Sequence, residues 1–222
     1  MTATLKQVYK RLLRAFGPQY WWPGDSPLEI MIGAVLVQNT SWKNVEKAIR
    51  NLKELDVLDP HALCRAPQEE LEEWVRPAGY FRIKARRLRS LMEFVVNHYD
   101  GSLEAMFATE LSQLREELLA VHGVGPETAD SILLYAGGLP VFVVDTYTHR
   151  VLARHGWIGF YADYYLLQDR FQESLPEDPV LFNEYHALLV RLGHLHCRKT
   201  PKCDGCPLAS LLPDGGPLEP DW

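Results

Sequence analysis

A two-glycine turn between two helical segments is the feature of this sequence that most restricts its fold. Apolar residues recur at helical spacing from Leu111 to Val121, and a second helix is expected to begin at Pro126. The residues between them include Gly123-Val124-Gly125, and so short a connection predicts a tight helical hairpin. Each glycine lacks a Cβ and permits positive φ, so backbone amides here can approach a phosphate at the helix N-terminus. An ordinary corner between two helices remains the alternative, because a Gly-Val-Gly turn alone is a weak signal.

Helical periodicity extends over most of the chain, and no segment shows a convincing strand pattern. The clearest helix start is Ser26-Pro27-Leu28-Glu29, which offers an N-cap serine, a proline at the first helical position and a capping-box glutamate. The N-terminal segment has the spacing of an amphipathic helix, and 139–144 reads as an apolar connector. Further helices are predicted at 40–52, 68–75, 83–99, 111–121, 126–136, 145–155 and 183–192. The pattern predicts an all-α protein with short links.

The composition is that of an ordinary globular chain of 222 residues, with 47% hydrophobic and 23% charged residues. No apolar run approaches the roughly 20 residues of a membrane span, and the N-terminus lacks the apolar core of a signal peptide. We therefore expect a cytoplasmic protein. The net charge of −6 argues mildly against nucleic-acid binding, but local clusters matter more than the total. Two basic runs fit either a nucleic-acid contact or a solvated face: Arg82, Lys84, Arg86, Arg87 and Arg89, and then Arg198, Lys199 and Lys202.

An aspartate follows the hairpin and changes its interpretation. Asp145 stands in Val144-Asp145-Thr146-Tyr147, twenty residues after Gly125. Together, the hairpin and this segment resemble the helix-hairpin-helix, Gly/Pro-rich and aspartate signature of the endonuclease III superfamily of DNA glycosylases. The resemblance extends across nearly the whole chain. The family patterns LPGVG-x-x-TA, VDTH-x-x-R and G-x-Y-x-x-KA correspond to 121–129, 144–150 and 79–85, with Tyr147 in the histidine position.

This resemblance implies the all-α, two-lobed helix-hairpin-helix glycosylase fold. A six-helix barrel lobe with the hairpin would span 21–138, and 1–20 with 139–222 would form a helical lobe from both termini that carries the cysteine loop. It also implies a base excision repair enzyme that acts on double-stranded DNA with a flipped damaged base, as a monomer at the bacterial nucleoid.

The aspartate serves catalysis in this family, so the resemblance gives that role to Asp145. Breaking an N-glycosidic bond builds positive charge on the sugar. A fixed carboxylate stabilises that charge and can orient or deprotonate an attacking water. Asp145 also suits the N-cap of a helix that begins at Thr146, and the two roles are compatible because a cap fixes the carboxylate.

Bifunctional family members carry a lysine on the second hairpin helix, which attacks the sugar and forms a Schiff base. That position, two residues after Gly125, is Glu127 in this chain, and a carboxylate cannot form an imine. The resemblance therefore implies a monofunctional glycosylase that uses water, without strong AP-lyase activity. Lys84 is not expected to replace the lysine; a phosphate contact or a surface charge is the favoured interpretation.

Tryptophans near the first long helix suggest a substrate. Tryptophan clusters usually belong to a hydrophobic core. However, the positions of Trp22, Pro23 and Trp42 resemble those of the 3-methyladenine glycosylase branch. By this resemblance, these three residues would line the base pocket and Glu127 would form its wall. Alkylated purines such as 3-methyladenine carry positive charge, and stacking on tryptophan gains roughly 0.5–2 kcal/mol. A cationic base also leaves readily. The expected substrate is therefore an N-alkylated purine, although aromatic pockets also suit other lesions, such as oxidised bases.

Base excision requires extrusion of the target nucleotide at a cost of a few kcal/mol, and a side chain must fill the gap. By resemblance, Gln38 and Tyr80 occupy the positions from which such wedges enter the stack. Gln38 fits equally well as a polar residue at a helix end. Tyr80 replaces the leucine of the pyrimidine-specific branch and could fill the gap by stacking.

Three cysteines cluster near the C-terminus. Family members often end with C-x6-C-x2-C-x5-C around a [4Fe–4S] cluster; here Cys197-x5-Cys203-x2-Cys206 is followed by Leu212 in the fourth position. The alternatives are a cluster with a non-cysteine fourth ligand, a zinc site completed by a histidine, or no metal. The other donors nearby in sequence are His194, His196 and Asp214.

Two hypotheses of another class remain. A damaged-DNA-binding protein without catalysis would keep the hairpin and lose the aspartate, so the presence of Asp145 favours an enzyme. A zinc module with an unrelated helical body would share only the cysteines. Metal analysis and a DNA-binding assay separate these hypotheses.

Overall fold

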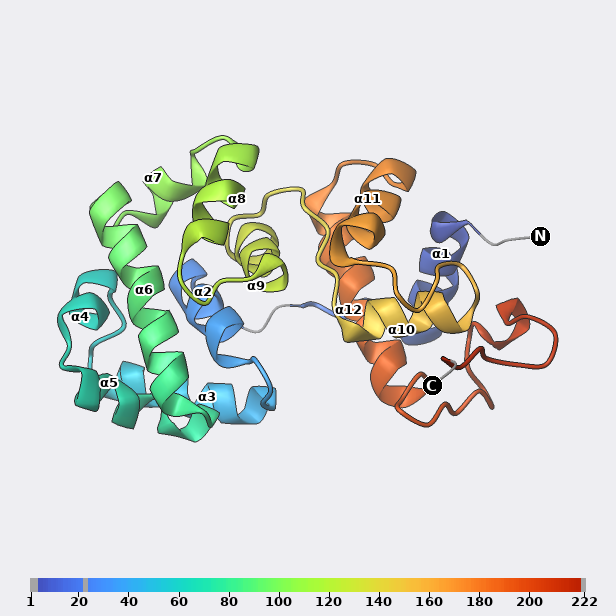
Figure 1. The fold of residues 1–222 in the computed structure, drawn as a ribbon, viewed down its shortest axis with the longest axis horizontal. Coiled ribbons are helices and arrows are strands. Elements are labelled where there is room, and N and C mark those ends of the chain that lie inside the picture. Colours follow the sequence, from blue (N-terminus) through green and yellow to red (C-terminus); the bar gives the residue numbers. More distant parts are fainter. Residues whose placement is uncertain (1–3, 22–23, 221–222) are drawn as a thin grey trace. The chain divides into compact units, whose positions relative to one another are not determined.

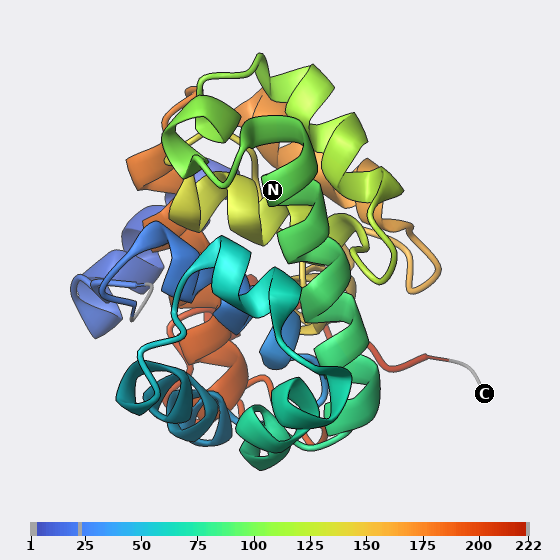
Figure 2. The same ribbon diagram turned by 90° about the vertical axis from the view of Figure 1, so that its left-hand side faces the viewer.

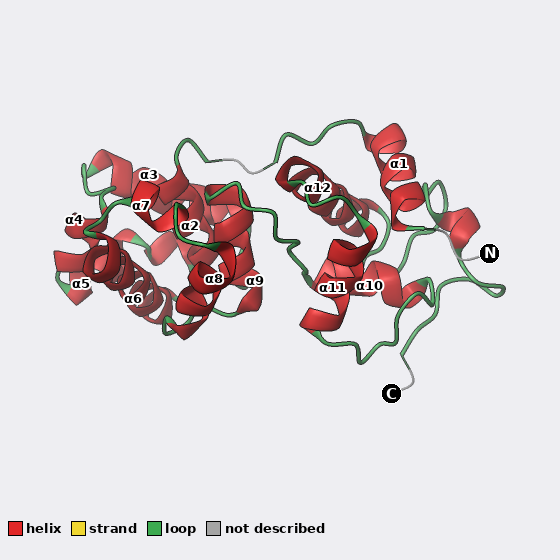
Figure 3. Ribbon diagram, turned by 90° about the horizontal axis from the view of Figure 1, so that it is seen from above, coloured by secondary structure: helices red, strands yellow, loops and turns green. Residues whose placement is uncertain are grey.

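The computed structural model describes residues 4–21 and 24–220, and within these ranges every regular element is a helix (Figure 3). The chain divides into two compact units. The central unit is Trp22–Leu139, and the terminal unit combines Met1–Trp21 with Pro140–Trp222. In the described part of the chain, no helix has both the length and the apolar composition needed to cross a bilayer.

The central unit is built around α2 (Pro27–Leu36), in which nine of the ten residues are buried. A helix that is apolar all round must be covered by neighbours, and α2 packs against α3 (Trp42–Glu54), α6 (Phe81–Tyr99) and α9 (Pro126–Ser131). Ser26 caps α2 as predicted, accepting a hydrogen bond from the Glu29 amide at 3.3 Å. The Glu29 carboxylate does not complete the predicted capping box with Ser26. It accepts a hydrogen bond from the Asp25 amide (3.4 Å) and forms an ion pair with Lys53 Nζ (2.8 Å).

The long helix α6 organises the rest of this unit (Figures 1 and 2). It contacts α2, α4 (Pro60–Arg65), α5 (Gln68–Trp74) and α7 (Leu103–Phe107). The hairpin joins α8 (Leu111–Ala120) to α9, and the π-helical turn Ile132–Ala136 continues α9. The short helices α4 and α7, of six and five residues, are not predicted by the sequence pattern.

The terminal unit contains α1 (Leu5–Phe16), α10 (Thr146–Arg154), α11 (Tyr164–Ser174) and α12 (Pro179–Leu195). Helix α12 packs against α1 and α10, and α11 is a further helix that the sequence pattern does not predict. The core of the terminal unit is aromatic. Phe142, from the predicted apolar connector, stacks on Phe171 with ring centroids 3.9 Å apart. The buried Tyr185 hydroxyl donates to the Leu5 carbonyl oxygen at 2.9 Å and ties α12 to α1.

Candidate functional site

Asp145 lies at the N-terminus of α10, directly after the buried apolar segment 141–144. Its backbone is extended, and its Oδ1 accepts a hydrogen bond from the Thr148 amide at 2.7 Å. This geometry confirms the predicted N-cap. The side chain is 11% exposed, so the carboxylate is fixed in orientation yet reaches the surface.

His186 is a partner of Asp145 that sequence reasoning missed. It is buried on α12, and its Nε2 lies 3.6 Å from Asp145 Oδ2. Burial opposes ionisation of Asp145, but the nearby His186 imidazole and the hydrogen bond from the Thr148 amide outweigh burial and lower the pKa of the carboxyl. The carboxylate is therefore ionised at neutral pH, as stabilisation of a developing cation requires. No local motif distinguishes His186, since the contact depends on how α12 packs against α10.

A cationic pocket lies next to Asp145 in the terminal unit. Within it, the Tyr147 hydroxyl and His194 Nε2 are 2.8 Å apart, and a Cβ on Gly193 would come within 2.2 Å of the Tyr147 ring. Glycine at this position therefore allows the ring to lie against α12. The pocket includes three full cations and no carboxylate, which suits an anion such as a phosphate. It is lined by Thr146, Tyr147, Arg150, Gly193, His194, Arg198 and Lys199.

The two glycines of the hairpin have different conformations. Gly123 has φ of +85°, and an added Cβ would lie 2.2 Å from Arg87 Cγ. Gly125 has φ of −97° and nothing within 4 Å of an added Cβ, so the expectation of positive φ holds only for Gly123. The Val124 side chain is buried, so only the backbone of this residue is available to bind a ligand at the turn. The close approach of Arg87 explains why the first glycine is required.

This contrast gives a stability prediction. Gly123→Ala is expected to lower the free energy of unfolding by about 1–2 kcal/mol through the left-handed backbone, with a further loss from the contact with Arg87. Gly125→Ala is the matched control and should change stability by less than about 0.5 kcal/mol. Thermal denaturation of the two variants beside the wild type measures both effects. Equal midpoints for the two variants would contradict the assignment of strain to Gly123.

Gln38, expected at a wedge position or a helix end, is held by two partners within the central unit. Its Nε2 donates to Thr128 Oγ1 at 3.0 Å, and its Oε1 accepts a short hydrogen bond from Arg87. The side chain is thus oriented between α6 and α9, beside the hairpin. Asn39, the next residue, is exposed with φ of +54°, so the chain turns sharply at the end of α2.

Tyr80 and Lys84 lie at the start of α6, Tyr80 directly before the helix and Lys84 in its first turn. Tyr80 precedes the helix in a left-handed conformation with φ of +45° and is 71% exposed, so its ring is available to a partner. Lys84 is only 2% exposed, and its Nζ donates to the Ala78 carbonyl oxygen at 2.7 Å. The expectation of a surface charge at Lys84 is therefore wrong. Its ammonium closes the turn that presents Tyr80.

The expected base-pocket residues are only partly described. Trp22 and Pro23 lie outside the described residues. Trp42 is half-buried at the first position of α3, and Glu127 is exposed in the first turn of α9, where the helix dipole favours a carboxylate. Gln38 brings the end of α2 to Thr128, the neighbour of Glu127.

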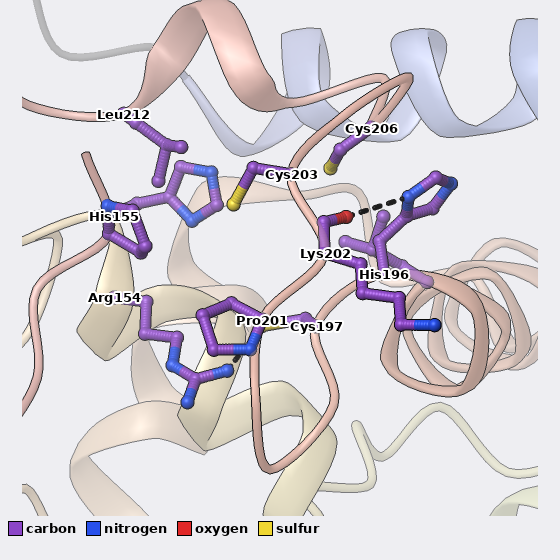
Figure 4. Close-up of a pocket in the computed structure, with 11 residues that line it drawn as sticks. Arg154, His155, His196, Cys197, Pro201, Lys202, Cys203, Cys206 and Leu212 are labelled. Atoms are coloured by element: carbon purple, nitrogen blue, oxygen red, sulfur yellow. Dashed lines mark hydrogen bonds between the residues drawn. The ribbon is translucent and has the colours of Figure 1, made fainter.

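The three clustered cysteines line one cavity in the terminal unit (Figure 4). All four cysteines are free thiols, and burial raises the pKa of Cys197 and Cys206. Among the described residues, no three His, Cys, Asp or Glu side chains are arranged around the position of a single metal ion. A zinc site needs its donors within about 2.3 Å of one ion, so the arrangement does not fit zinc. Three thiols around a shared cavity fit the larger body of an iron–sulfur cluster.

Comparison with known proteins gives concordant results. Residues 32–177 match the family described as HhH-GPD superfamily base excision DNA repair protein. A protein of Methanocaldococcus jannaschii named as a candidate DNA repair glycosylase is 46% identical over 204 residues, covering 91% of this chain and 92% of the relative.

Two solved structures are similar throughout. A trapped endonuclease III–DNA covalent intermediate has a TM-score of 0.80 and 27% identity, over 95% of this chain and 96% of the other. The Helicobacter pylori 3-methyladenine DNA glycosylase (MagIII) bound to 1,N6-ethenoadenine has a TM-score of 0.73 and 28% identity, over 86% and 98%. Both share the all-helical fold described above.

Proposed function

From the premise that this chain belongs to the HhH-GPD superfamily of base excision DNA repair proteins and is a DNA glycosylase, we propose that it hydrolyses the N-glycosidic bond of N-alkylated purines, such as 3-methyladenine, without strong AP-lyase activity. The observation that carries this proposal is the Asp145 carboxylate, fixed by Thr148 and kept ionised in part by His186. The enzyme acts on duplex DNA from which the damaged base has been flipped. We propose that it works as a monomer in the cytoplasm, at the nucleoid.

The carboxylate of Asp145 supplies what glycosidic hydrolysis needs. As the bond to the base breaks, the sugar develops positive charge, and a fixed anion stabilises that charge without reorganising. Oδ1 is already engaged by the Thr148 amide, while Oδ2 points toward His186. The same carboxylate can orient a water or accept its proton. Beside it, the pocket with Arg150, Arg198 and Lys199 suits the backbone phosphates of the substrate.

The proposed use of water rests on the absence of a suitable amine at the lysine position. Glu127 stands there and cannot form a Schiff base. Burial, with a smaller contribution from Arg87, lowers the pKa of Lys84 to about 8, which would favour a nucleophilic amine. However, Lys84 is almost fully buried with its Nζ bonded to Ala78, so it is not positioned to attack a sugar.

We therefore expect that borohydride will not trap a covalent complex between this protein and DNA that carries its lesion. An endonuclease III, the kind of enzyme for which a trapped covalent intermediate is known, serves as the positive control in the same assay. Denaturing gels that separate free protein from cross-linked protein report the result. A trapped band at the intensity of the control would show that another amine of this chain acts as nucleophile.

The substrate class rests on the aromatic residues and on one structural relative. The half-buried Trp42 provides a surface on which a cationic base can stack, and Trp22 and Pro23 are the sequence-based candidates that would complete the pocket. The similarity to MagIII, a 3-methyladenine glycosylase, supports this class. The similarity to endonuclease III leaves an endonuclease III-like glycosylase for oxidised bases as the alternative.

The test is a base-release assay on purified protein. We expect duplex DNA methylated at purine ring nitrogens to yield free 3-methyladenine, identified by mass spectrometry. Parallel duplexes with oxidised pyrimidines or uracil provide the comparison. Release of an oxidised base or uracil with no methylated purine would overturn the substrate class while keeping the glycosylase. Binding without release of any base would favour the non-catalytic damaged-DNA-binding protein.

A further inference from the structure

The cavity lined by Cys197, Cys203 and Cys206 offers three thiols but places an apolar side chain at the fourth position. Leu212 lines the same cavity, six residues after Cys206. Figure 4 shows Leu212 on the side of Cys203 and His196 on the side of Cys206. A cluster seated here would therefore meet three sulfur ligands from the protein and, at the fourth position, a hydrocarbon side chain.

The two histidines that line this cavity do not supply the missing ligand. Both ring nitrogens of His155 face carbonyl oxygens, Nδ1 that of Val151 at 2.7 Å and Nε2 that of Leu208 at 3.4 Å. His196 Nδ1 lies 3.1 Å from the Lys202 carbonyl oxygen. Because a carbonyl only accepts, this nitrogen carries the proton. The other nitrogen of the His196 ring lies on the side away from Cys203 and Cys206 (Figure 4).

The remaining candidates from the sequence lie elsewhere. His194 lines the cationic pocket, where its Nε2 is 2.8 Å from the Tyr147 hydroxyl. Asp214 is not among the residues that line the cysteine cavity. Among the described residues that line this cavity, the three thiols thus remain as the candidate iron ligands.

We propose that this cavity binds an iron–sulfur cluster through Cys197, Cys203 and Cys206 alone, and that the cluster corner beside Leu212 has no protein ligand. An iron at that corner would be exchangeable, because no side chain of the protein would hold it. The site is therefore suited to interconversion of four-iron and three-iron clusters. When [4Fe–4S]2+ loses this iron by oxidation, it yields [3Fe–4S]+, Fe2+ and one electron, which an added oxidant accepts.

Arg154 stabilises the loop that would carry these three ligands. It is 4% exposed, and its Nη1 donates to Cys197 Sγ at 3.7 Å and to the Arg198 carbonyl oxygen at 2.6 Å. Its Nη2 donates to the Lys199 carbonyl oxygen at 2.8 Å and pairs with Glu219. A guanidinium that holds both the sulfur and the following backbone keeps the ligands in place when the fourth is absent. Hydrogen bonds to cluster sulfurs also adjust the reduction potential.

The test uses the full chain purified without oxygen, with iron and sulfide analysis and electron paramagnetic resonance before and after addition of ferricyanide. The wild type is expected to lose one iron in four and to develop the signal of an oxidised three-iron cluster. Adding Fe2+ and a reductant should restore the starting state. Leu212→Cys is the matched variant, and it should retain all four irons under the same treatment.

A second measurement does not depend on the folding of that variant. Isotopically enriched Fe2+ added to the oxidised wild type should label one iron site of the cluster, as seen by Mössbauer spectroscopy. A wild-type cluster that keeps four irons through oxidation would overturn the proposal, as would a chain isolated without iron and sulfide. Because these readouts are spectroscopic, they stand apart from base release and from the proposed substrate.

Discussion

Asparagine in place of Asp145 is expected to slow base release by roughly 10²–10⁴-fold while leaving affinity for duplex DNA intact. The amide oxygen of asparagine can still accept the Thr148 N–H, so α10 keeps its cap. What is lost is the negative charge, which lies next to His186 in the wild type. Single-turnover release rates and equilibrium DNA binding, measured on the same preparations, separate the chemical step from binding.

Asp163 provides the control for this substitution. It caps α11 in the same unit, and its carboxylate accepts the Leu166 amide at 2.8 Å. Asp163→Asn makes the same chemical change at an equivalent cap and should leave base release unchanged. If Asp145→Asn and the wild type released base at the same rate, the catalytic assignment would be wrong, and Asp145 would be only a cap.

The features predicted correctly from the sequence are those determined within a few residues. The N-caps at Ser26 and Asp145 depend on one side chain and an amide three residues later. The strong apolar pattern of α2 likewise identifies a central buried helix. Helices of five or six residues, such as α7 and α4, carry too few periods for this signal, so packing in the folded unit determines them.

The partners of the candidate site residues could not be predicted in this way. His186 reaches Asp145 from 41 positions along the chain, and Arg87 reaches Gln38 from 49. Both contacts depend on how helices pack, which one sequence does not specify. The burial of Lys84 could not be predicted from the sequence either. Its position in a basic run predicted exposure, whereas the Ala78 carbonyl oxygen provides a buried acceptor for its ammonium.

Arg115→Met is expected to lower the free energy of unfolding by about 3 kcal/mol. Arg115 on α8 makes two hydrogen bonds to Asp130 on α9, at 2.7 and 3.0 Å, and thereby joins the two helices of the hairpin. The Asp130 side chain is fully buried, so removal of the guanidinium leaves a carboxylate in the core without its cationic partner. At about 2–4 °C per kcal/mol, the melting temperature should fall by about 6–12 °C.

Two further variants make this prediction specific to the buried pair. Arg76→Met removes an exposed arginine that pairs with Glu73 at the surface, and it should cost less than about 1 kcal/mol. Arg115→Met combined with Asp130→Leu removes both charges and should recover much of the lost stability, because the penalty comes from burying the carboxylate without the charge of the arginine. Without that recovery, the cost would belong to lost packing of the arginine stem. DNA binding by the double variant is a separate measurement. It reports whether the hairpin needs the ion pair itself to bind DNA, or only the close packing of α8 against α9.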